Sequence, residues 1–595
     1  MLKARLNLTK LLWALGLCGL PVASSSATIS DNCTHGAHIR ACWGNGFNIF
    51  TDYSNPSNVP PGKLVEYDLV VSHQSIAPDG YERPGLVVNG QYPGPTIEAN
   101  WGDTLRITVH NNLTWNGTSI HWHGLHQWHA NWVDGVPGVT QCPIPPGQSQ
   151  VYEFRAMQYG TTWYHSHYAE ASHSTNERIG PLVIHGPSSA NYDSALGPWL
   201  LGDYFHTDIF GAQETDGVAK DDPLVVTSTI NGKGVSNRTI DHGEHFEVIF
   251  QTGWKYKIGL VGTQSAVAHI FWIDGHNFTV IQADLVPIEP YITDTLVVAL
   301  GQRYEIVVEA NADISHDTDF WIHLKSCDET KPVPHRVGIV RYDAGSTNLP
   351  NTYPLSIHRQ HPICKDPDPT SLVPVVRQKV GNRVNTRDPV DYLTVGRQTY
   401  TTPDLESRFF KWIMKDRPQL LNLAEPSLKS VSENSQVQLR PETVPVYLDF
   451  DTDEWVQFVI TTNYSLSIVD TPRVEFPSYH PIHLHGHDFA ILAQGHGPFT
   501  EDIVPNLDNP PRRDTAVVEA GGYLWIAFQL NNPGVWLLHC HYLHHSESGL
   551  SLQFIEQRSK IKELMDEGGK FDELSNQCDV WSRWSRESTD LDDTM

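Results

Sequence analysis

The stretch WLLHCHYLHHSESGL, residues 536–550, decides the fold and raises the first chemical question. It begins as an apolar run typical of a buried β-strand, and it places Cys540 between two histidines. Side chains at positions i and i+2 of a strand point to one face, and the residue between them points to the other. We therefore expect His539 and His541 to face one space and Cys540 another, so that one strand serves two metal sites.

Three more H-x-H units occur in strand-like settings: His121-Trp122-His123, His165-Ser166-His167 and His483-Leu484-His485. His485-Gly486-His487 also fits the spacing, but His487 follows a glycine and is expected in a loop. With 31 histidines in 595 residues, random placement gives roughly one or two such pairs, and a single pair is more often a pair of core or surface histidines. Four pairs in apolar or aromatic, strand-like settings indicate instead that eight imidazoles converge. Neutral imidazole binds copper, zinc, iron and nickel, so the spacing alone leaves the metal open.

The sulfur has its own candidate partners. His545 lies five residues after Cys540, and His480 lies three residues before His483. Two histidines and one thiolate make a trigonal blue-copper site. Its axial position falls near Leu550, which cannot ligate, so the reduction potential should be high. Zinc is the alternative metal, but it has no redox chemistry that would use a sulfur between two histidine ligands.

The first 27 residues predict a signal peptide, because Lys3, Arg5 and Lys10 precede the apolar run LLWALGLCGLPVA. An N-terminal membrane anchor is the alternative, although the run is too short to span a bilayer in the mature protein. We expect a secreted, extracellular or cell-wall glycoprotein, with sequons at Asn32, Asn112, Asn116, Asn237, Asn277 and Asn463. The net charge of −27 argues against nucleic acid and anionic membranes as partners.

The mature chain would keep seven cysteines, an odd number. In an oxidising compartment this count predicts three disulfides and one thiol reserved for chemistry. The thiol of Cys540 is the candidate. Which of the other cysteines pair with each other is left open by the count.

Between residues 64 and 360 the chain alternates short β-branched runs with turn residues, which favours an all-β fold of sandwiches or barrels. A weak repeat supports several copies: PPGQSQVYEFRA near 145, DHGEHFEVIFQT near 241 and TDEWVQFVITTN near 452 each lead from a turn into an apolar strand. Linkers are expected near 187–193 and 354–372. One surface helix is expected after Ser559.

Four motifs, SIHWHGLHQ, TTWYHSH, HPIHLHGHDF and HCHYLHHSESGL, occur in the order found in one family. From about Cys33 to Cys578 the chain resembles a fungal multicopper oxidase of the ascomycete laccase type. The resemblance implies three cupredoxin-like Greek-key β-sandwich or barrel domains and a short C-terminal helical tail. The expected division is 1–27 signal peptide, 28–188 first domain, 189–365 second domain and 366–595 third domain with the tail.

The resemblance also implies four copper ions. It assigns type 1 copper to His480, Cys540 and His545, with Leu550 in the axial place; type 2 to His121 and His483; and the two type 3 ions to His123, His165 and His541 and to His167, His485 and His539. It implies the disulfides Cys33–Cys42, Cys142–Cys578 and Cys327–Cys364.

The implied activity takes single electrons from phenolic or other electron-rich aromatic substrates at type 1 and reduces O2 to water at the other three ions. Asp134, in NWVDGVPG, matches the family's acid near that cluster, although an aspartate before glycine is also an ordinary turn residue. The enzyme is expected to be a monomer. It would be either a general laccase or a narrower enzyme of pigment or secondary-metabolite synthesis.

Three departures from the ascomycete laccases favour the narrower enzyme or limit the comparison. The stretch GTQSAVAHIFWIDGH has Val267 or a neighbouring alanine where those laccases carry a pocket carboxylate, so a general base is missing. His544 replaces a tryptophan and is either a substitute base or an ordinary exposed histidine. Phe410 and Trp412 do match the family's pocket aromatics, although aromatic residues at positions i and i+2 more often simply pack on a sheet. The terminal DLDDTM lacks the ending that fills the oxygen tunnel.

Two other functions compete with this one. A metallo-oxidase for Fe(II) or Cu(I) would call for carboxylates or a methionine-rich segment near type 1, and the sequence has neither there. A non-catalytic extracellular copper-binding protein would not need a sulfur bridge between two differently shaped sites.

Overall fold

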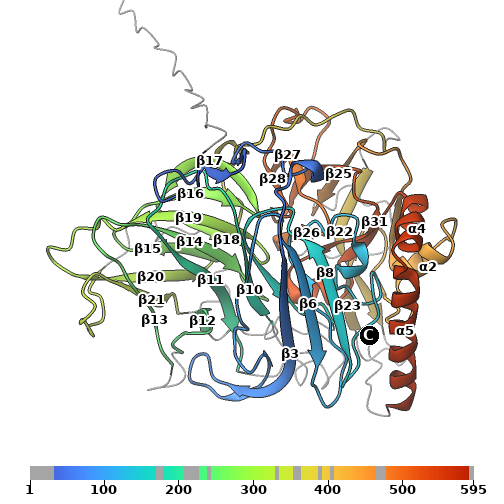
Figure 1. Ribbon diagram of the computed structural model, residues 1–595, viewed down its shortest axis with the longest axis horizontal. Helices are drawn as coiled ribbons and strands as arrows, with labels where there is room; N and C mark the ends of the chain where they lie inside the picture. The colour runs from blue at the N-terminus through green and yellow to red at the C-terminus, as the bar shows by residue number, and fades with distance from the viewer. Residues whose placement is uncertain are drawn as a thin grey trace, which may run out of the picture.

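The structure of the chain, a computed structural model, describes residues 33–168, 179–206, 225, 227–236, 243–327, 334–352, 364–385, 391–401, 408–462 and 478–588 (Figure 1). The predicted signal peptide, the sequons at Asn32, Asn237 and Asn463, and the terminal DLDDTM lie outside these residues. The sequons Asn112 and Asn277 are exposed. No helix among the described residues is both long and apolar enough to cross a membrane.

The N-terminal third forms a sandwich of two four-stranded sheets, which we call the first unit. One sheet has the order β4 (Arg83–Val88), β3 (Leu64–Ile76), β6 (Thr104–Asn111), β8 (Ser149–Arg155), and the other β5 (Ile97–Asn100), β10 (Ile179–His185), β9 (Gly160–His165), β7 (His121–Trp122). A hairpin of β1 (Cys42–Gly44) and β2 (Phe47–Asn48) precedes them. Every second residue of β6 is buried, as expected for a strand that covers a core on one face.

The second and third units each pair a six-stranded with a five-stranded sheet. In the second unit the orders are β12 (Thr227–Ile230), β11 (Ser194–Tyr204), β14 (Lys255–Gly262), β19 (Arg303–Glu309), β16 (Phe278–Ala283), β17 (Val286–Thr293), and β13 (Phe246–Ile249), β21 (Arg336–Arg341), β20 (Asp319–Ser326), β15 (His269–Ile273), β18 (Leu296–Val298). In the third they are β23 (Arg408–Met414), β22 (Asp391–Thr401), β25 (Trp455–Thr461), β30 (Gly522–Gln529), β27 (Phe489–His496), β28 (Arg512–Arg513), and β24 (Pro445–Leu448), β32 (Ser551–Glu556), β31 (Gly534–Cys540), β26 (His480–Leu484), β29 (Thr515–Val518).

The three units share one connectivity. Each has a parallel pair near one edge of one sheet: β3 with β6 in the first unit, and β11 with β14 and β22 with β25 in the six-stranded sheets of the other two. Each has a second parallel pair in the other sheet, β5 with β10, β13 with β21 and β24 with β32. The predicted all-β architecture of repeated sandwiches is therefore confirmed. The domain boundaries at 188/189 and 365/366 stay predictions.

The repeat that we took from the sequence joins strands that are not equivalent. PPGQSQVYEFRA leads into the edge strand β8, DHGEHFEVIFQT into the edge strand β13 of a five-stranded sheet, and TDEWVQFVITTN into the interior strand β25. By position in the sheet, the counterparts of β8 are β19 and β30. β8 lies next to β6, and β19 and β30 lie next to β14 and β25 in the same way. A turn followed by an apolar strand recurs throughout a β-sandwich, so it does not identify a position in the repeat.

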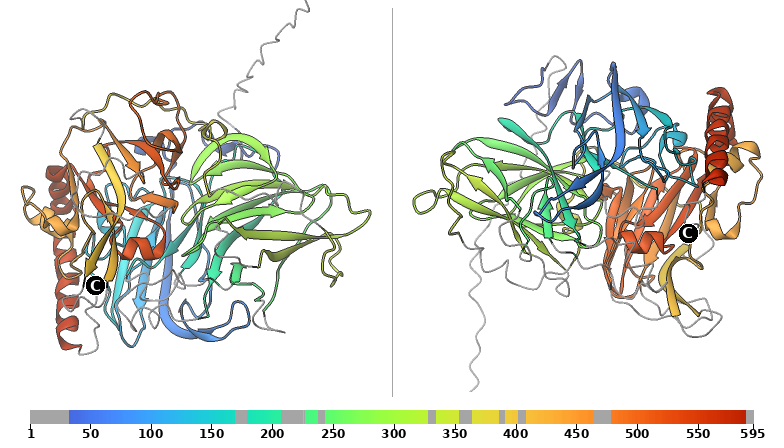
Figure 2. Two further views of the ribbon diagram at one scale, coloured as in Figure 1. Left: turned by 180° about the vertical axis from the view of Figure 1, so that it is seen from behind. Right: turned by 90° about the horizontal axis from the view of Figure 1, so that it is seen from below.

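The C-terminus contains two helices, where the sequence predicted one. They are α4 (Arg558–Glu567) and α5 (Lys570–Glu587), and they are separated by Gly568 and Gly569. Gly569 adopts a left-handed conformation with φ of 63°, which favours glycine and breaks the helix. In Figures 1 and 2 both helices lie along the outer side of the third unit, beside α2 (Ser427–Glu433).

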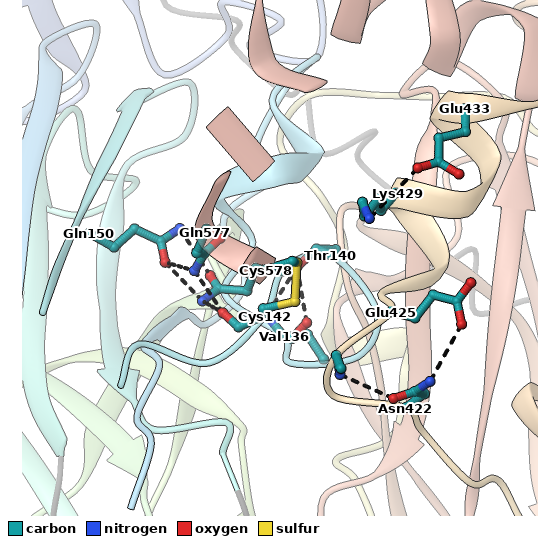
Figure 3. Close-up of a disulfide and its surroundings, with 12 residues drawn as sticks. Val136, Thr140, Cys142, Gln150, Asn422, Glu425, Lys429, Glu433, Gln577 and Cys578 are labelled. Atoms are coloured by element: carbon teal, nitrogen blue, oxygen red, sulfur yellow. Dashed lines mark hydrogen bonds and ion pairs between the residues drawn. A yellow bond between two sulfur atoms is a disulfide. The ribbon is translucent and has the colours of Figure 1, made fainter. Parts of the chain in front are cut away.

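The longer helix is not simply a surface element. Leu574, Cys578 and Trp581 of α5 are buried, and they share an apolar cluster with Val136 and Val139 of the first unit. The Cys142–Cys578 disulfide lies in this contact, and the side-chain amide of Gln577 donates to the Cys142 carbonyl at 2.7 Å (Figure 3). The helix therefore fastens the end of the chain to the first unit.

The implied cysteine pairing is found in full. Disulfides join Cys33 to Cys42, Cys142 to Cys578 and Cys327 to Cys364. Cys540 is the free cysteine among the described residues, and it is buried.

Replacing both Cys142 and Cys578 by serine should loosen α5. Loss of a crosslink that closes a long loop is expected to lower the free energy of unfolding by roughly 2–5 kcal/mol. Limited proteolysis should cut residues 558–588 faster than in the wild type. The matched control replaces Cys33 and Cys42, which are only 9 residues apart and close a much shorter loop. Equal cleavage of all three proteins would mean that apolar contacts alone hold the helix.

Candidate metal centres

Two neighbouring strands, β26 and β31, carry residues of both predicted kinds of site. They pair antiparallel with His483 opposite His539 and Ile482 opposite Cys540. His480 and His483 are an odd number of positions apart, so they leave β26 on opposite faces, as Cys540 and His539 leave β31. Each strand therefore contributes to a sulfur-containing site on one face and to a histidine cluster on the other.

The sulfur-containing site has the expected three members. The Cys540 sulfur lies 3.6 Å from Nδ1 of His480 and 3.7 Å from Nδ1 of His545, and the two nitrogens are 3.2 Å apart. All three side chains are buried. The ring of Trp412 lies against both histidines, with ring centroids at 5.0 Å and 4.1 Å. This triangle of one sulfur and two nitrogens is the donor set of a trigonal copper site.

The surroundings of the sulfur are apolar. Leu550 is fully buried and its backbone carbonyl accepts from the Cys540 amide at 3.1 Å. Burial raises the pKa of the Cys540 thiol, and the backbone N–H of Tyr542, which donates to the sulfur at 3.4 Å, only partly opposes this. A thiolate here therefore requires a cation, which a bound metal supplies.

The eight histidines of the four H-x-H units converge in one cluster between the first and third units. Within the three predicted sets the ring centroids are 5.0–5.8 Å apart: His121–His483 5.8 Å; His123–His165 5.7 Å, His123–His541 5.0 Å and His165–His541 5.6 Å; His167–His485, His167–His539 and His485–His539 each 5.3 Å. The ligand nitrogens of His167, His485 and His539 all lie within 4.8 Å of one another. His121 is equally close to members of the other sets, so the cluster is one continuous site.

The hydrogen bonds of these rings indicate which nitrogens face a metal. Backbone carbonyls accept from Nδ1 of His121 at 2.7 Å, of His165 at 2.9 Å and of His539 at 3.0 Å. Several other buried nitrogens have no hydrogen-bond partner among the described residues: Nε2 of His121, His165, His483 and His541, and Nδ1 of His123. Such atoms are costly unless something binds them. The cluster therefore fits metal ions, with His123 offering Nδ1 and the others Nε2.

Burial also favours the neutral form of most of these rings and of His480. Desolvation lowers the pKa of His480 and of His541 to about 3 and places the pKa values of His123, His165, His167, His485 and His539 well below the ordinary value. A metal binds the neutral imidazole, so no proton has to be displaced.

Two aspartates contact the cluster, and only one of them was predicted. Asp134, at the end of the short helix η2 (Asn131–Val133), accepts from His121 through its backbone carbonyl and lies 2.9 Å from Nδ1 of His485 through its carboxylate. It is thus a turn residue and a contact of the cluster at once, so the two alternatives for Asp134 do not exclude each other.

Asp514 is the residue that the sequence analysis missed. Its carboxylate lies 3.3 Å from Nδ1 of His483 and 3.4 Å from Nε2 of His123. Burial raises the pKa of Asp514, but the guanidinium of Arg303 and its hydrogen bonds outweigh burial and hold that pKa well below the ordinary value. A lone aspartate in RRDT has no spacing that distinguishes it, and its partner Arg303 is 211 positions away.

Part of the second unit packs with the surroundings of the sulfur-containing site in one apolar cluster. Val267 is fully buried in the same cluster of side chains as Trp412 and Cys540. The carboxylate of Asp203 accepts from the backbone amides of Ser265 and Ala266 at 2.8–3.0 Å. The stretch 263–268 therefore presents no carboxylate of its own to the sulfur-containing site, in agreement with the sequence.

His544 lies in the short helix α3 (Leu543–Glu547) and is 9% exposed. The alternative of an ordinary exposed histidine is therefore wrong, because the first turn of α3 is packed against the core. Its role as a substitute base stays a prediction. The side chain of Phe410 lies outside the described residues.

Comparison with known proteins agrees with the geometry. Family models described as multicopper oxidase match residues 70–189, 196–345 and 413–560. Dihydrogeodin oxidase of Aspergillus terreus is 54% identical over 582 residues, which cover 96% of each chain. Laccase-2 of Botryotinia fuckeliana is 37% identical over 95% of this chain and 93% of that protein.

A solved structure extends the match to three dimensions. The laccase of Botrytis aclada superimposes with a TM-score of 0.84 at 37% identity and covers 94% of this chain and 99% of that chain. These relatives do not favour a metallo-oxidase or a non-catalytic copper-binding protein. The chain belongs to the multicopper oxidase family: it is a laccase-type oxygen oxidoreductase of cupredoxin-like domains whose cofactors are four copper ions.

Proposed function

We propose the following residues as the copper ligands. His480, Cys540 and His545 hold type 1 with Leu550 in the axial place, His121 and His483 hold type 2, and the type 3 ions are held by His123, His165 and His541 and by His167, His485 and His539. The ring distances within each set and the partnerless buried nitrogens support this assignment. The observation that carries it is the position of Cys540, which faces away from the two histidines beside it.

When bound, the copper at Cys540 accepts electrons one at a time and the other three ions deliver them to O2, which four electrons reduce to two waters. The chain provides the connection between the two places. His539 and His541 are the covalent neighbours of Cys540, and Nδ1 of His539 is hydrogen-bonded to the Cys540 carbonyl at 3.0 Å. With copper bound at both places, the backbone from Cys540 to His539 and His541 and the hydrogen bond to the Cys540 carbonyl would provide the path for electrons.

Asp134 is the proposed proton donor beside the cluster. Its side chain is fully buried and lies between His121 and His485, at 3.3 Å and 2.9 Å from their Nδ1 atoms. Reduction of O2 to water consumes protons, and this carboxylate is near the proposed type 2 and type 3 ligands. The position of Asp134 and the resemblance of its motif to that of ascomycete laccases support its role as proton donor.

The proposed substrate is a phenolic small molecule of pigment or secondary-metabolite synthesis rather than a broad range of phenols. The second-unit stretch around Val267, which shares an apolar cluster with Trp412, lacks the carboxylate base of general ascomycete laccases. The relative named for the oxidation of one compound, dihydrogeodin oxidase, is 54% identical, whereas the laccases named above are 37% identical. Secretion, glycosylation and a monomeric state belong to the same proposal.

Replacing Cys540 by serine should remove the blue absorption at roughly 600 nm that thiolate–copper sites give. One copper should be lost, oxygen consumption should stop, and the copper bound by the eight histidines should remain. Absorption spectroscopy, metal analysis and an oxygen electrode measure these effects. Undiminished turnover in the variant would contradict the proposed electron path.

Replacing Leu550 by methionine should lower the reduction potential of type 1, because an axial thioether stabilises Cu(II). A spectroscopic redox titration of the blue band measures the shift. The matched control is Leu552→Met. Leu552 is also fully buried in that core, but it pairs with Leu538 rather than contacting the Cys540 backbone. An equal shift in both variants would mean that general core polarity, not the axial position, sets the potential.

Oxygen uptake on a panel of phenols, naphthols, Fe(II) and ascorbate tests the substrate class. We expect kcat/KM to be highest for a small subset of phenols and at least about tenfold lower for Fe(II). A tenfold difference in kcat/KM corresponds to about 1.4 kcal/mol of discrimination between the two transition states. Preference for Fe(II) over every phenol would replace this proposal with the metallo-oxidase.

A further inference from the structure

The second unit supplies none of the proposed copper ligands, yet one of its turns touches the cluster. Residues 299–302 connect β18 to β19, and Gly301 in this turn has a φ of 82°. A Cβ atom on Gly301 would lie 2.8 Å from Cδ2 of His541 and 3.1 Å from Cε1 of His123. The backbone of the second unit is therefore in van der Waals contact with two of the proposed ligands.

The first residue after this turn, Arg303, extends the contact. It is 1% exposed, and its guanidinium binds both oxygens of Asp514 in the third unit, with Nη1 donating to Oδ1 at 2.6 Å and Nη2 donating to Oδ2. Nη1 also donates to the Gly301 carbonyl at 3.0 Å. Gly124, next to His123, has a φ of 76°, and a Cβ there would lie 2.2 Å from Nη2 of Arg303. The chain thus leaves space for this ion pair beside a proposed ligand.

Asp514 holds two proposed ligands in the same way that Asp134 holds two others. The carbonyl of Asp514 lies 3.0 Å from Nδ1 of His483, and its carboxylate oxygen lies 3.4 Å from Nε2 of His123. The rings of His123 and His483 are stacked at 3.9 Å, as the rings held by Asp134 are stacked at 4.0 Å. Each aspartate therefore uses its carbonyl for a proposed type 2 ligand and its carboxylate for a proposed type 3 ligand.

The two aspartates differ in what holds them. Among the ion pairs of the described residues, Asp514 is joined to an arginine and Asp134 only to histidines. The second unit also fixes the neighbours of Asp514, because Asp284 binds the Arg513 guanidinium at 2.8 Å and 3.0 Å and accepts from the Thr515 amide at 3.3 Å. The residues on both sides of Asp514 are thus anchored to the second unit, Arg513 by its side chain and Thr515 by its backbone amide.

We infer that Arg303 and Asp514 are a positioning pair through which the second unit fixes the rings of His123 and His483 and so keeps the type 2 copper and one type 3 copper bound. The inference rests on the ligand assignment proposed above. A carboxylate attached by one flexible bond can rotate, whereas a bidentate guanidinium fixes both of its oxygens in one plane. Lysine offers a point charge without this fork, so it cannot hold the carboxylate plane. Asp514 in turn fixes each ring by the nitrogen opposite the one that faces the metal.

The test is Arg303→Lys in the copper-loaded full-length protein. Changes in groups that orient metal ligands typically weaken metal binding by about 10–100-fold. We expect type 2 copper to be lost to a chelator about 10–100 times faster than from the wild type. The type 2 hyperfine splitting in the electron paramagnetic resonance spectrum should change, while the type 1 signal and the blue band should not.

The matched control is Arg341→Lys. Arg341 is a buried arginine of the second unit in a two-point ion pair with Glu247, at 3.0 Å and 2.6 Å. Its other hydrogen-bond and ion-pair partners are Asn348 and Asp319, and neither is a proposed copper ligand. It should lose stability as Arg303→Lys does without changing the type 2 signal or its retention. If Arg303→Lys does not fold, Asp514→Asn replaces it, because asparagine keeps the size of the side chain but loses the charge and one acceptor. The same change of the type 2 signal is expected.

Two outcomes would overturn the inference. One is that Arg303→Lys loses type 2 copper to the chelator no faster than the wild type and shows an unchanged type 2 signal. Where Arg303→Lys does not fold, the same result in Asp514→Asn would overturn it. The other is an equal change in the Arg341→Lys control, which would reveal a general effect of lost stability. A wild-type protein without separate type 1 and type 2 signals would instead refute the ligand assignment, so failure of the proposed function and failure of this inference are distinguishable.

Discussion

The alternation of side chains along a β-strand is the constraint on which the two metal centres depend. Because neighbouring residues leave a strand on opposite faces, β31 can direct Cys540 to one centre and His539 to the other with no loop between them. β26 does the same with His480 and His483. The separation of the two centres is then set by the backbone of two paired strands, which are buried along their whole length.

A second constraint is the placement of the units, because no unit holds the histidine cluster alone. Asn532 of the third unit binds one loop of the first unit at two points: its amide nitrogen donates to the His126 carbonyl at 2.7 Å, and its oxygen accepts from the His129 amide at 2.9 Å. Asn131 exchanges two hydrogen bonds with Val535, both at 3.0 Å. Such buried polar contacts add little net stability, but they are directional, and direction is what a site shared between units needs.

The sequence was sufficient where the signal was periodic or repeated. The β architecture, the two faces of β31 and the convergence of four H-x-H units follow from alternation and spacing, and the disulfide pairing followed from the resemblance. The sequence of the tail predicts one helix when its helical pattern is continued through Gly568 and Gly569, but the structure has two helices separated by these glycines. Asp514 and Arg303 could not be predicted, because single charged residues 211 positions apart meet only when the second and third units assemble.

The missing pocket carboxylate also has a structural consequence for how a phenol is oxidised. A buried acid of the second unit, Asp203, is held in place by the backbone amides of Ser265 and Ala266, and burial raises its pKa to about 6. Both of its oxygens accept from those amides, so Asp203 holds the loop at residues 265–266 in place. Under the proposed function, a phenolic proton would leave to water or to another group, and His544 is the predicted candidate. Selection among phenols would then depend on shape and apolar contact, in keeping with the apolar cluster that contains Val267 and Trp412.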